Sequence, residues 1–169
     1  MTFFGESIMT TRILLADQST ARFYDIDQAD APLRLVGELT DPDSRLKDRD
    51  LKSDRPGRVY DHASTGTRRS AVPHHSTGGE ETPRRHGAQV FANRIVHELE
   101  TAREARLFDR LVLIAGPQFM GMLRSAMSKH LTEVIGAEVL KDLLHAPESA
   151  VRAHLAETAF PSHELPSHP

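Results

Sequence analysis

Residues 109–115 read DRLVLIA, and the dipeptide Gly116-Pro117 follows them directly. The last five residues of this run are all apolar, which is typical of a strand that is buried on both faces of a sheet. Gly116 ends the strand, and Pro117 suits the first position of a helix, where its missing N–H is not needed. We therefore expect an α/β fold in which this strand is central and a helix follows over residues 117–130.

On the N-terminal side, three apolar segments predict an antiparallel meander. Residues 11–16 (TRILLA) and 21–26 (ARFYDI) are joined by the turn-forming sequence DQST, which favours a β-hairpin. Residues 33–39 (LRLVGEL) alternate between apolar and polar, which predicts a third strand. Residues 1–10 are expected to be a disordered extension.

The second half of the chain alternates between helical and strand patterns. Apolar residues recur at helical spacing over residues 88–105, residues 134–140 predict a fifth strand, and residues 147–157 predict a last helix. The tail from residue 158 is expected to be disordered. This order predicts one domain over residues 11–157, with a mixed five-stranded sheet flanked by helices, and it is also the element order of the ribonuclease-H-like architecture. The expected core residues include Phe91, Ile95, Leu99, Leu111, Leu113, Phe119, Leu123 and Val151.

Composition excludes several classes of function. The chain has 169 residues, no cysteine and a formal net charge of -3. Without cysteine, a disulfide, a thiolate nucleophile and a Cys-based zinc site are all impossible. The charge provides no strong overall field that attracts nucleic acid. No apolar run approaches the roughly 18 residues of a membrane helix, and the N-terminus lacks the pattern of a secretory signal. We therefore expect a cytoplasmic protein without membrane insertion.

A long polar connection, residues 41–87, separates the meander from the second half. Its first part, residues 41–58 (DPDSRLKDRDLKSDRPGR), interleaves acids and bases and contains a turn at Pro56 and Gly57. Long loops in compact domains are usually functional or disordered, so this loop is expected to be partly mobile. The candidate binding residues in it are Asp54, Arg55, Gly57, Arg58, Arg68, Arg69, Arg84 and Arg85.

The turn at residues 54–58 allows two interpretations. The guanidinium groups of Arg55 and Arg58 suit bidentate binding of a phosphate or a carboxylate. Alternatively, one of them pairs with a neighbouring acid and holds the loop against the sheet. The rest of the loop, with its two arginine doublets, is either a solvated linker or a weakly basic binding surface.

Residues 39–58 and 89–131, most specifically SDRPGR (53–58) and FDRLVLIAGPQF (108–119), resemble the bacterial host-attachment protein family. The resemblance extends from about residue 12 to residue 155. That family is similar to the middle domain of eukaryotic and archaeal peptide-chain release factors. The resemblance implies a release-factor-middle-domain-like fold and a non-enzymatic interaction factor associated with the ribosome or RNA. The alternatives are a hydrolase acting on a tRNA ester or nucleic acid, and a protein-interaction factor that affects surface attachment indirectly.

Release factors of that kind act through a Gly-Gly-Gln tip, which this chain does not reproduce. The two nearest sequences are Gly78-Gly79-Glu80 and Gly87-Ala88-Gln89. Glu80 places a carboxylate where a neutral amide is needed, and Ala88 adds a Cβ where close backbone approach needs none. We therefore expect no peptidyl-tRNA hydrolysis.

Other patterns that would support catalysis or metal binding are weak. A ribonuclease-H-type nuclease needs carboxylates that converge on two divalent metals. The acids at or near strand ends are Asp17, Asp25 and Asp109. They have the character of turn or strand residues, and His74, His75 and His86 match no structural metal site. The junction at Gly116 lacks a nucleotide-binding fingerprint. We expect no catalytic residue, no metal and no cofactor, and the expected partners are the ribosome, an RNA or another protein.

Overall fold

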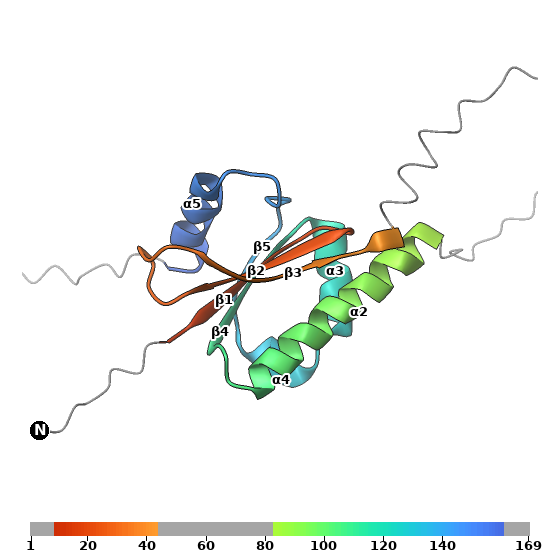
Figure 1. Cartoon of the computed structure of the whole chain (residues 1–169), viewed down its shortest axis with the longest axis horizontal. Helices are drawn as coiled ribbons and strands as arrows, with labels where there is room; N and C mark the ends of the chain where they lie inside the picture. Colours follow the sequence, from red (N-terminus) through yellow and green to blue (C-terminus); the bar gives the residue numbers. More distant parts are fainter. Residues whose placement is uncertain (1–8, 44–82, 161–169) are drawn as a thin grey trace, which may run out of the picture.

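The computed structural model describes residues 9–43 and 83–160. These residues form one five-stranded sheet with helices on both of its faces (Figure 1). The strands are β1 (Thr11–Ala16), β2 (Thr20–Ile26), β3 (Arg34–Thr40), β4 (Arg110–Ala115) and β5 (Ile135–Val139). The helices are α2 (Pro83–Glu104), α3 (Pro117–Ala126), α4 (Lys129–Glu133) and α5 (Glu148–Thr158).

The sheet is mixed, as the sequence predicts, with the order β3-β2-β1-β4-β5. β2 runs antiparallel to both β1 and β3, whereas β4 runs parallel to both β1 and β5. The prediction that β4 is central is wrong in one respect, because the middle position belongs to β1. β1 takes that position since it pairs with its hairpin partner on one side and with β4 on the other. β4 is nevertheless internal, and all five residues from Leu111 to Ala115 are completely buried.

Alternate residues of β1 and β4 supply two separate hydrophobic cores. Leu14 and Leu113 face the core under α2, α3 and α4, and Ile13 and Ile114 face the core under α5. This alternation follows from the two-residue period of a strand. Figure 1 shows α5 on one side of the sheet and the other three helices on the opposite side. All of the eight core residues expected from the sequence are buried, which confirms that prediction.

The helix expected over residues 117–130 is in fact two helices. α3 ends at Ala126, and Met127 adopts an extended conformation (φ -74, ψ 141). Ser128 then begins α4, because its hydroxyl oxygen accepts a hydrogen bond from the backbone N–H of Leu131 at 3.1 Å. A serine in this position satisfies one of the unpaired N–H groups at a helix start. The completely buried side chain of Leu131 anchors the short helix in the core.

Two boundaries differ from those predicted. α2 begins at Pro83, so residues 83–87 are helical and not part of the polar loop. Proline suits a first helical position, which explains this start. At the other end, α5 extends to Thr158, and Ala159 is completely buried. The ordered chain therefore continues past residue 157.

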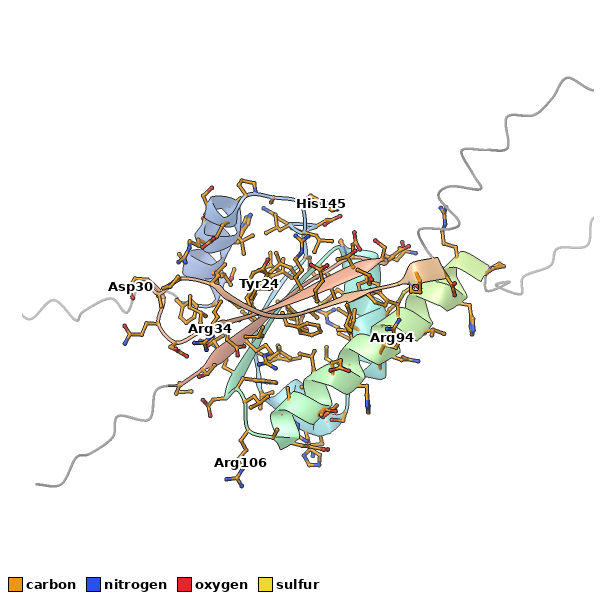
Figure 2. The ribbon with its side chains drawn as sticks, viewed as in Figure 1. Tyr24, Asp30, Arg34, Arg94, Arg106 and His145 are labelled. Carbon is orange, nitrogen blue, oxygen red and sulfur yellow. The ribbon has the colours of Figure 1, made fainter. Side chains whose placement is uncertain are left out.

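The residue two positions after the end of α2 has an unusual backbone conformation. Arg106 has a φ of 55°. Its N–H donates to the carbonyl of Arg103 at 2.9 Å, and the N–H of Leu107 donates to the carbonyl of Ala102 at 3.0 Å. These two bonds form a Schellman motif, in which glycine is the usual left-handed residue. The arginine side chain projects away from the body of the protein (Figure 2).

None of the helices in the described part of the chain is both long enough and apolar enough to cross a membrane.

Candidate functional site

Of the candidate binding residues, the structure describes Arg84 and Arg85. Both are exposed in the first turn of α2. The others lie outside the described residues, namely Asp54, Arg55, Gly57, Arg58, Arg68 and Arg69. The arginine doublet is thus presented by a helix and not by a loop.

The charges of α2 are segregated along its length. Residues 83–97 contain three arginines, two histidines and no acid, whereas residues 98–104 contain three glutamates and one arginine. The exposed basic side chains of the first segment, called the α2 basic face below, are Arg84, Arg85, His86, Arg94 and His97. This arrangement opposes the helix dipole, which favours acids at the N-terminus and bases at the C-terminus.

Two shallow grooves lie along the α2 basic face. One, of about 310 Å³, runs between α2 and Asp41 and Asp43, and the other, of about 370 Å³, runs between α2 and Leu39. Both grooves are lined by Val90 and Arg94. Val90 leaves 45% of its surface exposed. The surface therefore combines the positive charge of Arg94 with an uncovered apolar side chain, and Asp41, Asp43 and Glu98 border the same grooves.

Arg94 is held over an aromatic ring. Its guanidinium carbon lies 5.9 Å from the centroid of the Phe91 ring, within the range of a cation–π contact. Figure 2 shows Arg94 on α2. Its neighbours in the second groove are Asn93 and His97. A planar cation beside an amide and an apolar side chain is suited to stacking against a flat, polar ligand.

A third concave site, of about 460 Å³, lies outside the carboxyl ends of the parallel strands. Open α/β sheets commonly bind their ligands at this edge. It is lined by the β1–β2 turn, by the start of α3 at Gly116, and by Arg84. Its charged lining consists of three carboxylates and this one guanidinium, since Asp17, Asp41 and Asp142 also border it. That balance disfavours an anionic nucleotide.

The acids considered for a nuclease do not converge. Asp17 follows β1, and its carboxylate accepts hydrogen bonds from the N–H groups of Ser19 (2.8 Å) and Thr20 (2.7 Å). Asp25 and Asp109 lie at the opposite end of β1. Within residues 9–43 and 83–160, no group of three or more His, Asp or Glu side chains is arranged to hold a metal ion.

Gln89, the candidate in Gly87-Ala88-Gln89, lies within a helix and not at a loop tip. Its amide nitrogen donates to the carbonyl of Met122 on α3 (3.3 Å) and to Oδ1 of Asn93 (3.2 Å). Ala88 is 4% exposed and belongs to the core. The geometry therefore gives Gln89 a packing role. His86 is exposed on α2, while His74, His75 and the sequence Gly78-Gly79-Glu80 lie outside the described residues.

The sequence interpretation missed a buried ion pair. Arg12 of β1 donates from Nε and Nη2 to the two carboxylate oxygens of Asp25 on β2, at 2.8 and 2.9 Å. Its guanidinium carbon also lies 5.1 Å from the centroid of the Phe108 ring. The sequence did contain a signal for this pair. Each strand of the predicted hairpin has one charged residue at an inward position, Arg12 on the first strand and Asp25 on the second, and the two charges have opposite signs.

The fold and its surfaces define an α/β protein with a mixed, open five-stranded sheet. The chain belongs to the family described as "Protein required for attachment to host cells", whose sequence model matches residues 12–155. This confirms the resemblance seen in the sequence.

Solved structures and curated proteins add no functional assignment to the family match. A solved structure described as "Archaeal protein" matches 90% of this chain at 12% sequence identity, with a TM-score of 0.43. The chain spans 37% of the length of that protein. No curated protein matches the sequence.

Proposed function

We propose that this host-attachment family member is a non-enzymatic interaction factor that binds single-stranded RNA, free or within the ribosome, through the α2 basic face. The observation that carries the proposal is the charge segregation of α2. Fifteen residues at the start of the helix (83–97) contain no acid, although acids in the first turn stabilise a helix. Basic residues in the first turn weaken the helix, and an anion bound there would offset that cost.

The chemistry of the grooves agrees with RNA as that anion. Proteins bind single-stranded RNA through a basic surface combined with flat side chains, including arginine, on which bases stack. Arg94 and Asn93 provide a flat guanidinium and an amide beside the exposed Val90. Arg84 forms no ion pair with any residue that the structure describes, so its charge remains available to a phosphate.

The proposal includes a likeness to the middle domain of release factors, without their hydrolytic activity. A three-stranded meander followed by parallel strands and helices supports that likeness. Gln89 is held between α2 and α3 by its hydrogen bond to Met122, which supports a function without ester hydrolysis. The sequence candidates Arg55, Arg58, Arg68 and Arg69, which lie outside the described residues, remain candidates for binding the same RNA.

The test is fluorescence anisotropy with a single-stranded RNA oligonucleotide, together with ribosome co-sedimentation. The double variant Arg84→Gln, Arg94→Gln should bind more weakly. Its dependence of log K on log salt should flatten by about 0.7, because Arg84 supplies the phosphate contact and each lost phosphate contact on a single strand removes about 0.7. The matched control is Arg106→Gln, which removes an exposed arginine at the other end of the same helix and should bind like the wild type.

Two results contradict the proposal. The first is a double variant that binds RNA and ribosomes as tightly as the Arg106→Gln control. The second is a wild-type protein that binds neither, which would favour a protein partner for this face.

A further inference from the structure

A pocket of about 590 Å³ lies between the sheet and the C-terminal half of α2, and it shares Leu39 and Glu98 with the second groove of the α2 basic face. Its wall includes Phe23 and Leu39 from the sheet and Ala102, Ala105 and Leu107 from α2 and the residues after it. Pockets that bind small molecules have volumes of roughly 300–1,000 Å³ and are mainly apolar with a few placed polar groups. This pocket meets that description.

Its rim carries apolar side chains that the fold leaves uncovered. Val36 is 43% exposed and Leu107 is 55% exposed. They approach from different elements, since Val36 belongs to the edge strand β3 and Leu107 follows α2. An apolar ligand that lies between them removes both surfaces from water, which is favourable by about 25 cal/mol for each Å² buried.

A row of three charged side chains crosses the sheet at this pocket. Arg12 of β1 is in register with Asp25 of β2, and Asp25 is in register with Arg34 of β3. All three line the pocket. The side chains of Arg12 and Asp25 are 9% and 7% exposed, so the middle of the row is buried. Figure 2 labels Arg34, which begins β3.

Arg12 offers the pocket a free hydrogen-bond donor. Its hydrogen bonds to Asp25 use Nε and Nη2, and Nη1 makes none within the described part of the chain. Among the same residues, no side-chain nitrogen or oxygen that is sealed from solvent lacks a partner. Nη1 is therefore in contact with solvent, and Arg12 lines the pocket. A guanidinium N–H without a partner is a ready donor for an acceptor oxygen of a ligand.

The row also has a surplus positive charge. Both carboxylate oxygens of Asp25 are taken by Arg12, and Arg34 forms no ion pair with any described residue. Glu38, on the same rim, is paired with Arg22 at 2.9 Å. The remaining carboxylate, Glu98, comes from α2 and not from the sheet. The lining as a whole holds two guanidinium groups and three carboxylates, and the excess positive charge is confined to the row formed by Arg12, Asp25 and Arg34.

We propose that this pocket binds a small amphipathic carboxylate. The carboxylate lies against Arg34 and Nη1 of Arg12, and the aliphatic chain lies along the wall formed by Val36, Ala105 and Leu107. The site adjoins the proposed RNA surface but is lined by neither Arg84 nor Arg94, so either proposal can fail without the other.

The test is isothermal titration calorimetry of the full chain with sodium octanoate. Acetate supplies the same head without a chain, and 1-octanol supplies the same chain with a neutral head. Octanoate should bind saturably. Octanol should bind about tenfold more weakly, which corresponds to the loss of about 1.4 kcal/mol, and acetate should give no measurable heat.

Variants locate the site. Arg34→Glu should weaken octanoate about tenfold, because it places like charges together, whereas Arg34→Lys keeps the charge and should stay within about twofold. Ala105→Trp should fill the pocket and abolish binding of both octanoate and octanol. Arg94→Gln, on the other half of α2, is the matched control and should bind octanoate like the wild type. Thermal melting checks that each variant is folded.

Three outcomes overturn the proposal. They are the absence of saturable octanoate binding by the wild type, equal affinities for octanoate and octanol, and a folded Arg34→Glu variant that binds octanoate as tightly as the wild type.

Discussion

Single residues show where this fold is most sensitive, and the Arg12–Asp25 pair is the clearest case. Replacing Arg12 by leucine leaves the carboxylate of Asp25 buried without its partner. Loss of one partner of a buried pair costs about 3–5 kcal/mol, so we expect urea denaturation to show a decrease of this size in the free energy of unfolding.

Replacing both residues provides the control. The double variant Arg12→Leu, Asp25→Leu removes both charges and should recover most of the lost stability, because paired apolar replacements are often neutral. If the double variant is as unstable as the single one, the cost arises from packing around Phe108 and not from an unpaired charge.

Glu100 makes stability depend on acid pH. Burial raises the pKa of its carboxyl group, but hydrogen bonds from Ser128 and Arg103 outweigh that effect and lower the pKa below its ordinary value of 4.5. A carboxyl group with a lowered pKa in the folded state stabilises the fold above its unfolded pKa, and the contribution is lost as pH falls through the folded pKa. Glu100→Gln should therefore be less stable than the wild type near pH 7.

The same variant should lose part of the pH dependence. The difference in melting temperature between Glu100→Gln and the wild type should shrink as the pH is lowered from 6 to below the ordinary pKa of 4.5. Glu104→Gln, an exposed glutamate on the same helix, is the matched control. A constant difference across this range would show that Glu100 acts through packing alone.

At the scale of elements, the end of α2 contains an avoidable strain. Arg106 occupies a left-handed position with a φ of 55°, where a Cβ is unfavourable. Arg106→Gly should raise the free energy of unfolding by about 0.5–1 kcal/mol. Glycine removes the strain, and the greater conformational entropy of glycine in the unfolded chain offsets part of this gain. The net gain corresponds to an increase of roughly 1–4 °C in the melting temperature.

The substitution Arg106→Ala separates charge from conformation. It removes the same exposed guanidinium but keeps a Cβ, so its melting temperature should stay near that of the wild type. An equal gain in the alanine variant would assign the effect to the lost charge.

The helices and strands that could be predicted from the sequence are those with a strong apolar periodicity. The residues of β1 to β5 and the inward faces of α2, α3 and α5 follow from alternation and helical spacing, and the mixed sheet follows from their order. The break between α3 and α4 was not predicted, because the apolar pattern continues through Met127 and Leu131. Ser128 is a visible helix start, but its capping bond depends on the turn that the chain makes there.

The candidate site was less predictable than the fold. Arg84 and Arg85 were identified from their charge, but the helix that presents them begins in a segment without apolar periodicity. The pocket beside Arg12 depends on cross-strand register, which aligns three residues that are far apart in the sequence. Local patterns contain no such information.

At the scale of the whole molecule, the two faces of the sheet are covered unequally. In the described part of the chain, the core that includes Ile13 and Val112 is covered by one helix, α5, through Val151 and Leu155. Leu155→Ala should lower the free energy of unfolding by about 2–5 kcal/mol, because it leaves a cavity in a completely enclosed position. Chemical denaturation measures this change.

The exposed Leu140 provides a matched leucine. Leu140→Ala removes the same atoms from a position that is 49% exposed and should change the free energy of unfolding by no more than about 0.5 kcal/mol. Similar losses in both variants would mean that α5 contributes little to the second core.

The central place of β1 has a consequence for the order of events during synthesis. Of the strands that the structure describes, β1 leaves the ribosome first, and its hairpin partner β2 follows within a few residues. Its parallel partner β4 comes much later, since the hydrogen bond between Thr10 and Asp109 beside this pair joins residues 99 positions apart. Contacts at such separation form slowly, because a long loop must close first. In the nascent meander, one side of β1 therefore remains unpaired until β4 has been synthesised.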